Sequence, residues 1–465
     1  RAGLPRGCAS FTPPTSSTSR HRRSCTGSSP APAGISAPAV CSCSTGPSVS
    51  VAAITPRATP PSMRSCAAGI RAGACATSTT SMPSPERPVS SDATRSSCPP
   101  TITYWSTNAG EGCRMLHEDG RSVDEVIAEL EAKREHDLKW SDGRTFAMVY
   151  DGGPAVHEVA ERAARLYLHE NALNTKAFPS LGEIQSEVVR WTAELLNGPD
   201  SVAGFLTSGG TESILCACLA ARERGEHERG VTEPEIVLAE SAHAAFHKAA
   251  HLFGMKVRKV PVKDDWTADV DAMAAELGPN TVLVVGSAPQ YPQGVVDPIP
   301  EIAALAQSVD ANCHVDACMG GFVLPFAERL GRSMPPWDFR VEGVTTISAD
   351  VHKLGYAPKG VSVILHRTKE SRRYQTFLFD GWLGGFYASP NLQGTRSGLP
   401  MACAWAVIQH LGVSGYVELT RQTLENADRM RAGIAAIDGI RVLGDGQFHL
   451  VAMASDPASA RPVDV

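Results

Sequence analysis

The sequence predicts an α/β protein with a mostly parallel sheet covered by helices, followed by a smaller α+β domain. From residue 199 onwards, short apolar runs alternate with amphipathic segments, which is the pattern of consecutive βα units. Thr281–Gly286 is a strongly β-branched run, and this composition favours a strand. After Pro400 the periodicity becomes helical, and two further short strands follow.

Three helices are expected before the alternating region. The first begins at Ser122, because Ser122 and Glu125 have the spacing of a capping box. Its apolar stripe consists of Val126, Ile127 and Leu130. The second helix covers residues 155–171, and the third begins near Ser180 and ends before Gly198.

The remaining elements follow in chain order. The expected strands cover residues 204–207, 236–239, 257–262, 281–286, 313–315, 344–347 and 361–365. The expected helices between them cover residues 211–224, 243–253, 270–277 and 299–309. The smaller domain is expected to hold a long helix over residues 415–437 and strands over 440–443 and 448–453.

The first 114 residues differ in composition from the rest. They contain 11 arginines, no lysine and 3 acidic residues, a formal net charge of +8, whereas the remainder has 32 basic and 46 acidic residues, a net charge of −14. A segment with a single leucine buries too little apolar surface to offset its ordering entropy, so we expect disorder. Its low complexity and its bias towards arginine over lysine are also typical of a non-native reading frame.

Three functional interpretations of this segment are weaker. A nucleic-acid-binding arm would be basic, but these arginines are scattered and lack interleaved aromatic residues. A zinc site at Cys41 and Cys43 has the wrong spacing and no partner pair. A transit peptide, which is rich in Arg and Ser and poor in acids, is a minor alternative.

From Met115 onwards the composition is that of a globular protein. Its five cysteines lie within apolar runs and are expected to be reduced core residues of a cytoplasmic protein. No run of about eighteen apolar residues occurs, so no transmembrane segment is expected. The predicted organisation is a disordered segment (1–114), an N-terminal helical segment (115–198), a large α/β domain (199–398) and a partial C-terminal domain (399–465).

A pair of glycines lies at a strand-to-helix junction in Thr207–Ser213, which reads TSGGTES. Glycines let the backbone approach an anion, and the free N–H groups and the dipole of the next helix attract a phosphate. Thr211 can add a hydroxyl donor. Taken alone, the motif is explained equally well by a tight turn with a helix cap.

His243 and Asp316 each follow a predicted strand. Small residues flank His243, which leaves room for a flat ring against the imidazole. A carboxylate at the carboxyl end of a parallel strand, such as Asp316, points into the crevice where α/β proteins bind ligands. Opposite a pyridine nitrogen it would keep that nitrogen protonated. Taken singly, the two residues could be a helix-terminal histidine and a helix cap.

Lys353 follows His352 in the run SADVHKLGYAPKG, after an apolar stretch that begins at Val344. A lysine with little bulk around it suits a Schiff base with an aldehyde cofactor. The amine must be uncharged to attack, so we expect burial or nearby cations to lower its pKa. The alternative is an ordinary surface lysine.

These four features occur in order on successive βα units. The spacing is 73 residues from His243 to Asp316 and 37 residues from Asp316 to Lys353. Each has a structural explanation alone, but their combination indicates a site for pyridoxal 5′-phosphate.

Residues from about 115 to 455 resemble the sphingosine-1-phosphate lyases, which are members of the group II decarboxylase family of pyridoxal-phosphate enzymes. The resemblance rests on the runs TSGGTES, SADVHKLGYAPKG, SAHAAF (241–246), HVDACMGGF (314–322), WDFRVEG (337–343) and GGFYASP (384–390). It implies the fold-type I architecture of pyridoxal-phosphate-dependent transferases, with a parallel sheet and a smaller C-terminal domain.

The resemblance also implies a role for each matching residue. The residues that bind the ring of the cofactor are Lys353, which forms the Schiff base, His243, which stacks on the ring, and Asp316, which pairs with its nitrogen. The residues that hold its phosphate are Gly210, Thr211, His352 and, for the cofactor of the neighbouring subunit, Thr395. The residues that line the substrate phosphate and the reacting carbon are Tyr150, Asn171, Tyr291 and Lys359.

The implied activity is a retro-aldol cleavage of a phosphorylated long-chain base into a fatty aldehyde and phosphoethanolamine. Lys359, Tyr291 and Lys353 are candidate proton carriers, and the sequence does not rank them. Asn174 stands in the substrate-phosphate region where the family commonly has a histidine. The family continues beyond the point that corresponds to Met453, so we expect the C-terminal domain to be incomplete.

Other functions compete with this interpretation. An amino-acid decarboxylase of the same fold shares the lysine, histidine and aspartate but usually lacks the equivalent of Lys359. An inactive, truncated remnant is a second alternative, and a nucleic-acid-binding protein is the least favoured. The expected partners are a small-molecule or lipid substrate and a second subunit, in a homodimer with its sites at the interface.

Overall fold

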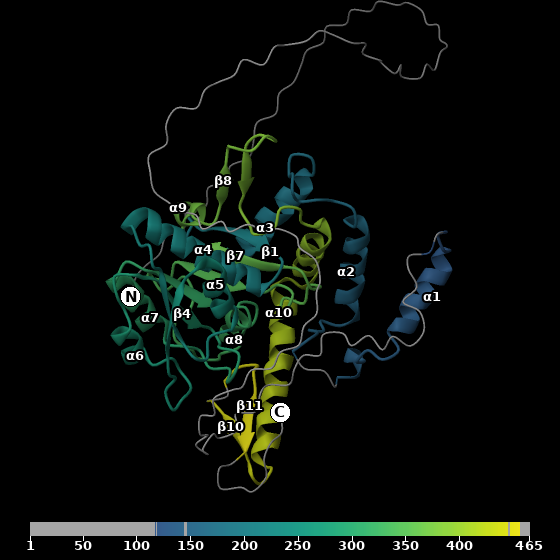
Figure 1. Cartoon of the computed structure of the whole chain (residues 1–465). Helices are drawn as coiled ribbons and strands as arrows, with labels where there is room; N and C mark the ends of the chain where they lie inside the picture. The colour runs from purple at the N-terminus through teal and green to yellow at the C-terminus, as the bar shows by residue number, and fades with distance from the viewer. Residues whose placement is uncertain (1–116, 118, 144–146, 445–446, 456–465) are drawn as a thin grey trace, which may run out of the picture. The chain divides into compact units, whose positions relative to one another are not determined.

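The structure is a computed structural model that describes residues 117, 119–143, 147–444 and 447–455. The expectations for residues 1–114 therefore lie outside the described residues. The elements below all belong to one compact unit, Gly112–Val465, and its described residues are drawn in colour in Figure 1.

The bounds of the elements agree with most of the sequence predictions. The helices are α1 (Val123–Lys133), η1 (Trp140–Asp142), α2 (Pro154–Leu166), α3 (Pro179–Leu195), α4 (Gly210–Arg229), α5 (Ala245–Phe253), α6 (Val270–Ala275), α7 (Ile299–Ser308), α8 (Leu324–Arg329), α9 (Lys369–Arg373) and α10 (Gly398–Ala435). The strands are β1 (Ala203–Thr207), β2 (Glu235–Ala239), β3 (Lys256–Val260), β4 (Thr281–Ser287), β5 (Asn312–Asp316), β6 (Thr346–Ala349), β7 (Ser362–His366), β8 (Phe377–Phe379), β9 (Tyr387–Ser389), β10 (Ile440–Leu443) and β11 (Ala452–Ser455).

Seven strands form one sheet in the order β1-β7-β6-β5-β4-β2-β3. All neighbours pair in parallel except those of β7, which is antiparallel to both β6 and β1. Because β1 and β6 both oppose β7, they run in the same direction as each other. The predicted mostly parallel sheet is confirmed, and the carboxyl ends of β1, β2, β4, β5 and β6 meet at one edge.

Helices cover both faces of this sheet (Figure 1). On β2, Ile236 and Leu238 pack in a cluster with α4 and α5. The alternate residues Val237 and Ala239 belong to the larger core, which also takes in α3 and α7. This alternation follows from the period of two along a strand, and it makes both faces of the sheet hydrophobic core.

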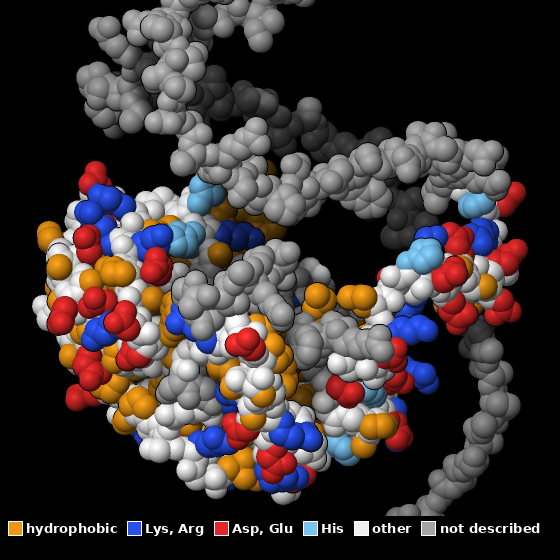
Figure 2. Space-filling view, turned by 90° about the horizontal axis from the view of Figure 1, so that it is seen from below, with side chains coloured by type: hydrophobic (Ala, Val, Ile, Leu, Met, Phe, Trp, Pro, Cys, Tyr) orange, Lys and Arg blue, Asp and Glu red, His pale blue; other side chains and the backbone are white. Residues whose placement is uncertain are grey.

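The first helix, α1, begins as the capping box predicts. Ser122 Oγ accepts a hydrogen bond from Glu125 N at 3.3 Å, and Ser122 N donates to Glu125 Oε2 at 2.9 Å. No residue of α1 is buried, so the predicted apolar stripe has no cover among the described residues. In Figure 2 many charged side chains lie on this helix, at the right of the view.

Several boundaries differ from the predictions for local reasons. The expected helix over 155–171 ends at Leu166, and Asn171 instead forms a β-bridge with Ser397. The expected helix from His243 begins two residues later, at Ala245. The strand expected over 448–453 lies at Ala452–Ser455, where it pairs antiparallel with β10.

Helix α10 begins at Gly398, although the sequence predicts its start at Gly415. Ser397 caps it, since Ser397 Oγ accepts from Leu399 N at 3.2 Å. Pro400 lies in the first turn, where a proline costs no helical hydrogen bond, and the helical periodicity noted after Pro400 belongs to this helix. The helix is interrupted at Gly412, whose φ of 53° and ψ of −175° are not helical.

The hairpin β8–β9 has no counterpart in the predictions because each strand has only three residues. It forms its own two-stranded sheet and projects at the top of Figure 1. Its large apolar side chains are exposed: Phe377, Leu378, Phe379, Trp382, Leu383 and Phe386. Within the described ranges, no helix has the length and hydropathy needed to cross a membrane.

Candidate active site

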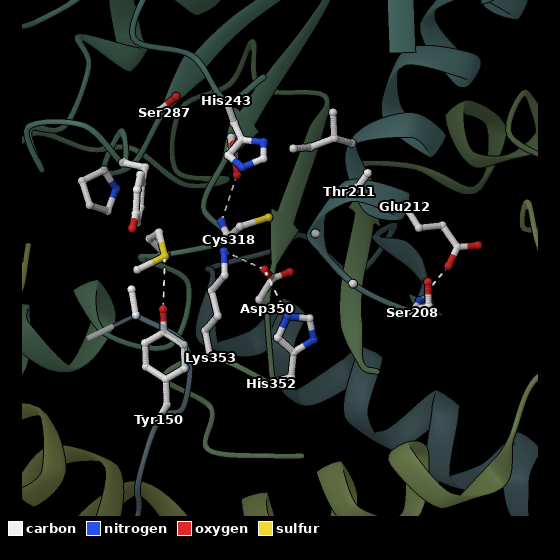
Figure 3. A pocket seen from close by; sticks show the side chains of 18 residues that line it. Tyr150, Ser208, Thr211, Glu212, His243, Ser287, Cys318, Asp350, His352 and Lys353 are labelled. Atoms are coloured by element: carbon white, nitrogen blue, oxygen red, sulfur yellow. Dashed lines mark hydrogen bonds and ion pairs between the residues drawn. The ribbon is translucent and has the colours of Figure 1, made fainter. Parts of the chain in front are cut away.

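A cavity of about 460 Å³ lies at the carboxyl-end edge of the sheet (Figure 3). Its size is in the range of small-molecule sites. The loops that follow β1, β2, β4, β5 and β6 supply most of its lining. The sequence-predicted residues that line it are Tyr150, Gly210, Thr211, His243, Tyr291, Asp316, His352 and Lys353.

The loop between β1 and α4 forms one wall. A Cβ atom at Gly210 would lie 2.7 Å from Asp350 Oδ2 and 2.8 Å from Cys318 Sγ, so only glycine fits there. Glu212 Oε2 accepts from Ser208 N at 2.7 Å and fixes the start of the turn. The N–H groups in the first turn of α4 have no helical acceptor and can bind an anion.

Lys353 reaches the cavity beside two other groups of the same loop (Figure 3). Its Nζ lies 3.0 Å from Asp350 Oδ2, and His352 Nε2 lies 3.7 Å from the same oxygen. Asp350 is buried, and neither of its oxygens has a hydrogen bond of regular geometry with a described residue. The three side chains thus form a compact charged group.

The electrostatics of Lys353 correct one expectation from the sequence. Burial lowers the pKa of this amine, but the charge of Asp350 and the neighbouring Cys318 and Asp316 raise it more, so the net shift is upward. The expected lowering of the Lys353 pKa is therefore wrong for the cofactor-free protein, because the sequence interpretation overlooked Asp350. Burial lowers the pKa of His352, which favours the neutral ring.

Asp316 is the last residue of β5, and hydrogen bonds from neighbouring residues fix its carboxylate. Its Oδ1 accepts hydrogen bonds from Cys318 N at 3.1 Å and from Ser348 Oγ at 3.3 Å. Its second oxygen, Oδ2, takes no hydrogen bond from a described residue, although Asp316 lines the cavity. One oxygen is thus fixed by the protein, and the other is available to a ligand.

His243 lies in the turn between β2 and α5 and is an exposed residue that borders the cavity. Its Nδ1 accepts a hydrogen bond from Ala245 N at 3.1 Å, which sets the orientation of the ring. Figure 3 shows the imidazole on the far side of the cavity from His352. The backbone bond matches the structural explanation from the sequence, and it leaves the face of the ring free.

Tyr150 and Lys359 lie together on another side of the site. Lys359 Nζ stands 4.8 Å from the centroid of the Tyr150 ring and donates to His352 O at 2.7 Å. The Tyr150 hydroxyl donates to Met319 Sδ at 3.9 Å. Burial raises the pKa of Tyr150, whereas burial and the charge of Lys353 lower the pKa of Lys359.

Four predicted residues are not among those that line the cavity: Lys359, which contacts the lining residue Tyr150, and Asn171, Asn174 and Thr395. Asn171 Oδ1 accepts from Leu173 N at 2.9 Å, and Asn174 Oδ1 accepts from Lys176 N at 3.0 Å, so both amides stabilise local turns. Thr395 is exposed. Their assigned roles in binding substrate or a neighbouring subunit's cofactor stay predictions.

The sequence interpretation assigned no role to several residues that the fold brings to the cavity, namely Asp350, Cys318, Met319, Ser208 and Ser287. Asp350 lies inside the run SADVHKLGYAPKG, three residues before the lysine. A carboxylate directly after a predicted strand was the available signal, and the same signal had already singled out Asp316.

The residues at this cavity fit pyridoxal 5′-phosphate. A phosphate needs N–H donors, which the glycine-cradled turn before α4 and the His352 ring can provide, and an aldehyde needs an amine, which Lys353 provides. A pyridine nitrogen needs a fixed carboxylate, which Asp316 provides. The buried oxygens of Asp350 lack regular hydrogen bonds, as expected of a site whose polar groups await a ligand.

Comparisons with known proteins agree with this chemistry. Residues 121–454 match the sequence profile of the pyridoxal-dependent decarboxylase conserved domain. Sphingosine-1-phosphate lyase 1 of Rattus norvegicus is 44% identical over 344 residues, which cover 74% of this chain and 60% of that protein. The L-aspartate decarboxylase of Thermococcus kodakarensis is 33% identical over 342 residues, 74% of this chain and 87% of that protein.

A solved structure gives the same result. The sphingosine-1-phosphate lyase of Burkholderia pseudomallei superimposes with a TM-score of 0.72 at 40% sequence identity, covering 75% of this chain and 81% of that one. The chain spans about 60% of the length of the rat lyase. Since the profile match includes every cavity residue described above, the chain belongs to the pyridoxal-dependent decarboxylase family, whose cofactor is pyridoxal 5′-phosphate.

Proposed function

We propose that this protein is a pyridoxal-phosphate-dependent lyase that cleaves the C2–C3 bond of a phosphorylated long-chain base. The observation that carries the proposal is the position of Lys359, whose ammonium lies against the His352 carbonyl and the ring of Tyr150, and both of these residues line the cavity. Decarboxylases of this fold usually lack this second lysine. The 44% identity to a sphingosine-1-phosphate lyase supports the same choice.

The bound cofactor would supply an electron sink for the carbanion that remains after the bond breaks. Lys353 would anchor the cofactor covalently, and Gly210, Thr211 and His352 would hold its phosphate. His243 would pack against the ring. Asp316 would keep the ring nitrogen protonated through its free Oδ2, because Oδ1 is already held by Cys318 N and Ser348.

The cleavage needs a group that removes the proton of the substrate 3-hydroxyl and one that returns a proton to C2. Tyr150, Tyr291 and Lys353 line the cavity, and Lys359 adjoins Tyr150. Burial and the charge of Lys353 lower the pKa of Lys359, which brings its amine nearer to neutrality than a solvated lysine. We therefore infer that Lys359 and Tyr150 form the proton-transfer pair.

The substrate phosphate would lie toward Asn171 and Asn174. An amide at position 174 donates hydrogen bonds without adding the charge that a histidine can carry. The side chain of Asn174 accepts two backbone N–H groups through Oδ1, so its NH₂ group remains available to donate. Because Asn174 carries no ionisable group, we expect the affinity for substrate to change less between about pH 6 and 7 than it would with a histidine at this position.

The products distinguish the lyase from its main competitor. The full chain is incubated with pyridoxal phosphate and a phosphorylated long-chain base, and separately with L-aspartate and L-glutamate. We expect a fatty aldehyde and phosphoethanolamine from the first, and no carbon dioxide from the second. Carbon dioxide release from an amino acid without any aldehyde product would make the protein a decarboxylase. The absence of both products would favour the inactive remnant.

We further propose that the protein acts as a homodimer with its sites at the interface. The hairpin β8–β9 supports this, because a free two-stranded hairpin with six exposed large apolar side chains is marginal in water. Thr395 follows this hairpin in sequence and is exposed, as a residue that reaches a neighbouring site must be. The five buried free thiols among the described residues are consistent with a reducing compartment, which we infer to be the cytoplasm.

The dimer is tested with Leu383→Glu, which adds a charge at the tip of the hairpin. We expect dissociation to monomers in analytical ultracentrifugation and loss of turnover. Leu252→Glu is the matched control, because Leu252 is also exposed but lies on α5. A dimer that survives Leu383→Glu but not Leu252→Glu would place the interface elsewhere.

A further inference from the structure

Behind Asp316, a connected set of buried polar side chains crosses strands β5 and β6. His314 Nδ1 lies 2.8 Å from Thr346 Oγ1, and His314 Nε2 lies 3.2 Å from Ser348 Oγ. Ser348 Oγ in turn lies 3.3 Å from Asp316 Oδ1. The register of the sheet places His314 beside Thr346 and Asp316 beside Ser348, so the pairing of β5 with β6 builds the chain of contacts.

The hydrogen bonds have one consistent direction if Asp316 is a carboxylate. A carboxylate only accepts, so the Ser348 hydroxyl donates to it. Ser348 Oγ is then free to accept from His314 Nε2–H and from the Cys318 thiol, which lies 3.3 Å away. His314 Nδ1 consequently carries no proton and accepts from the Thr346 hydroxyl.

The surroundings keep His314 in this neutral form. The residue has no exposed surface and packs edge-on against Phe246, with ring centroids 5.8 Å apart. Burial lowers its pKa to about 4, against which the nearby charge of Asp316 acts in the opposite sense. A neutral ring with a fixed tautomer donates to Ser348 without adding a positive charge behind Asp316.

We propose that His314 and Ser348 are positioning residues, which fix the orientation of the Asp316 carboxylate and aim its free oxygen at the ring nitrogen of pyridoxal phosphate. This inference rests on the proposed role of Asp316. Two fixed donors on Oδ1 stabilise the charged carboxylate and leave Oδ2 to the ring. Loss of the Ser348 hydroxyl removes one donor and disconnects His314 from the carboxylate.

The test compares Ser348→Ala with Ser362→Ala in the full chain loaded with pyridoxal phosphate. Ser362 is a matched control, because its side chain is also fully buried and its hydroxyl bonds Ser213 Oγ at 2.9 Å, without a contact to Asp316. The readouts are the rate at which the cofactor dissociates and the visible absorbance spectrum of the bound cofactor. Asp316→Asn, alone and combined with Ser348→Ala, supplies the reference.

We expect Ser348→Ala to release the cofactor about tenfold faster or more, since a hydrogen bond to a charged group is lost. Its spectrum should shift in the direction that Asp316→Asn produces, and Ser362→Ala should change neither quantity. In the Asp316→Asn background, Ser348→Ala should add little, because both changes act through one carboxylate. His314→Phe keeps a flat ring without nitrogens and should weaken cofactor retention in the same sense.

The outcomes separate this inference from the proposed function. If Asp316→Asn leaves retention and spectrum unchanged, the assigned role of Asp316 is wrong. If Asp316→Asn has its effect but Ser348→Ala behaves like Ser362→Ala, only the positioning role is wrong. Additive effects in the double variant would also overturn it, and a His314→Phe protein with wild-type retention would remove His314 from the chain of contacts.

Discussion

Lys353 and Asp350 define the chemistry of the site at the residue scale. The 3.0 Å ion pair keeps the amine charged in the cofactor-free protein, although a charged amine cannot attack an aldehyde. If Lys353 anchors pyridoxal phosphate as proposed, its covalent attachment would require that this amine first lose a proton. The carboxylate that orients the amine also opposes this step.

Asp350→Asn tests that balance. Without the carboxylate, the upward shift in the Lys353 pKa should largely disappear, because the charge of Asp350 raises this pKa more than any other group does. The pH profile for incorporation of pyridoxal phosphate into cofactor-free protein should move to lower pH, by about one unit or more. Stopped-flow absorbance measures the rate. Asp338→Asn is the control, since Asp338 is equally buried but pairs with Arg340, and a profile that shifts in both variants would contradict the account.

Lys359 separates binding of the cofactor from cleavage. Lys359→Ala removes the ammonium from the Tyr150 ring but leaves Lys353 and the phosphate donors in place. Cofactor content should stay at the wild-type level, while aldehyde production should fall at least about 100-fold, as is typical for loss of a proton-transfer group. The exposed Lys248 gives the control variant Lys248→Ala. Full turnover in Lys359→Ala would exclude Lys359 from the mechanism.

Residues that follow predicted strands were the part of the site accessible from the sequence. Asp316, His243 and Lys353 could be found because a parallel sheet brings the carboxyl ends of its strands together. Asp350 satisfied the same rule and was missed beside the more familiar His-Lys pair. The contacts of Lys359 could not be predicted, because they depend on how residues around Tyr150, far away in sequence, fold back over the cavity.

At the scale of the elements, helix α10 shows what periodicity can and cannot predict. The sequence shows helical periodicity after Pro400 but predicts one long helix only from Gly415, because the break at Gly412 divides α10 into two helical parts. A proline in the first turn does not end a helix, whereas a glycine in a non-helical conformation does interrupt it. The hairpin β8–β9 escaped prediction because strands of three residues carry too little pattern.

Two glycines of α10 provide a matched test of this break. A Cβ atom would meet nothing within 4 Å at either Gly412 or Gly433, but only Gly412 has a positive φ, of 53°. Gly412→Ala should lower the free energy of unfolding by about 1–3 kcal/mol through backbone strain. Gly433→Ala should raise it by about 0.5–1 kcal/mol, since it lies in regular helix. Urea denaturation measures both, and equal effects of the two changes would mean that the helix is continuous through Gly412.

At the scale of the whole molecule, buried histidines link stability to pH. His366 is fully buried on β7, its Nε2 lies 2.8 Å from Gln375 Oε1, and burial lowers its pKa to about 4. Unfolding restores a pKa near the ordinary value of 6.5. Between about pH 6.5 and pH 4 the unfolded chain therefore binds a proton at His366, whereas the folded chain does not. Stability is therefore complete above about pH 6.5 and is lost as the pH falls toward 4. Asp297 acts in the opposite sense, because burial raises its pKa to about 6.

His366→Gln isolates one of these contributions. The wild-type protein should lose up to about 3 kcal/mol more free energy of unfolding than the variant between about pH 7 and pH 4. Denaturant titrations of the full chain across that range give the comparison. Parallel curves for the two proteins would contradict the lowered pKa, because they would mean that His366 binds its proton equally well in the folded and unfolded states.

The whole-molecule account depends on one prediction, that pyridoxal phosphate is attached covalently to Lys353. The direct measurement is borohydride reduction of the protein loaded with pyridoxal phosphate, followed by peptide mass spectrometry. We predict a pyridoxyl group on the peptide that contains Lys353 and none on that peptide from Lys353→Ala. A pyridoxyl group on Lys359 or on any other lysine, or no stable attachment at all, would contradict the account.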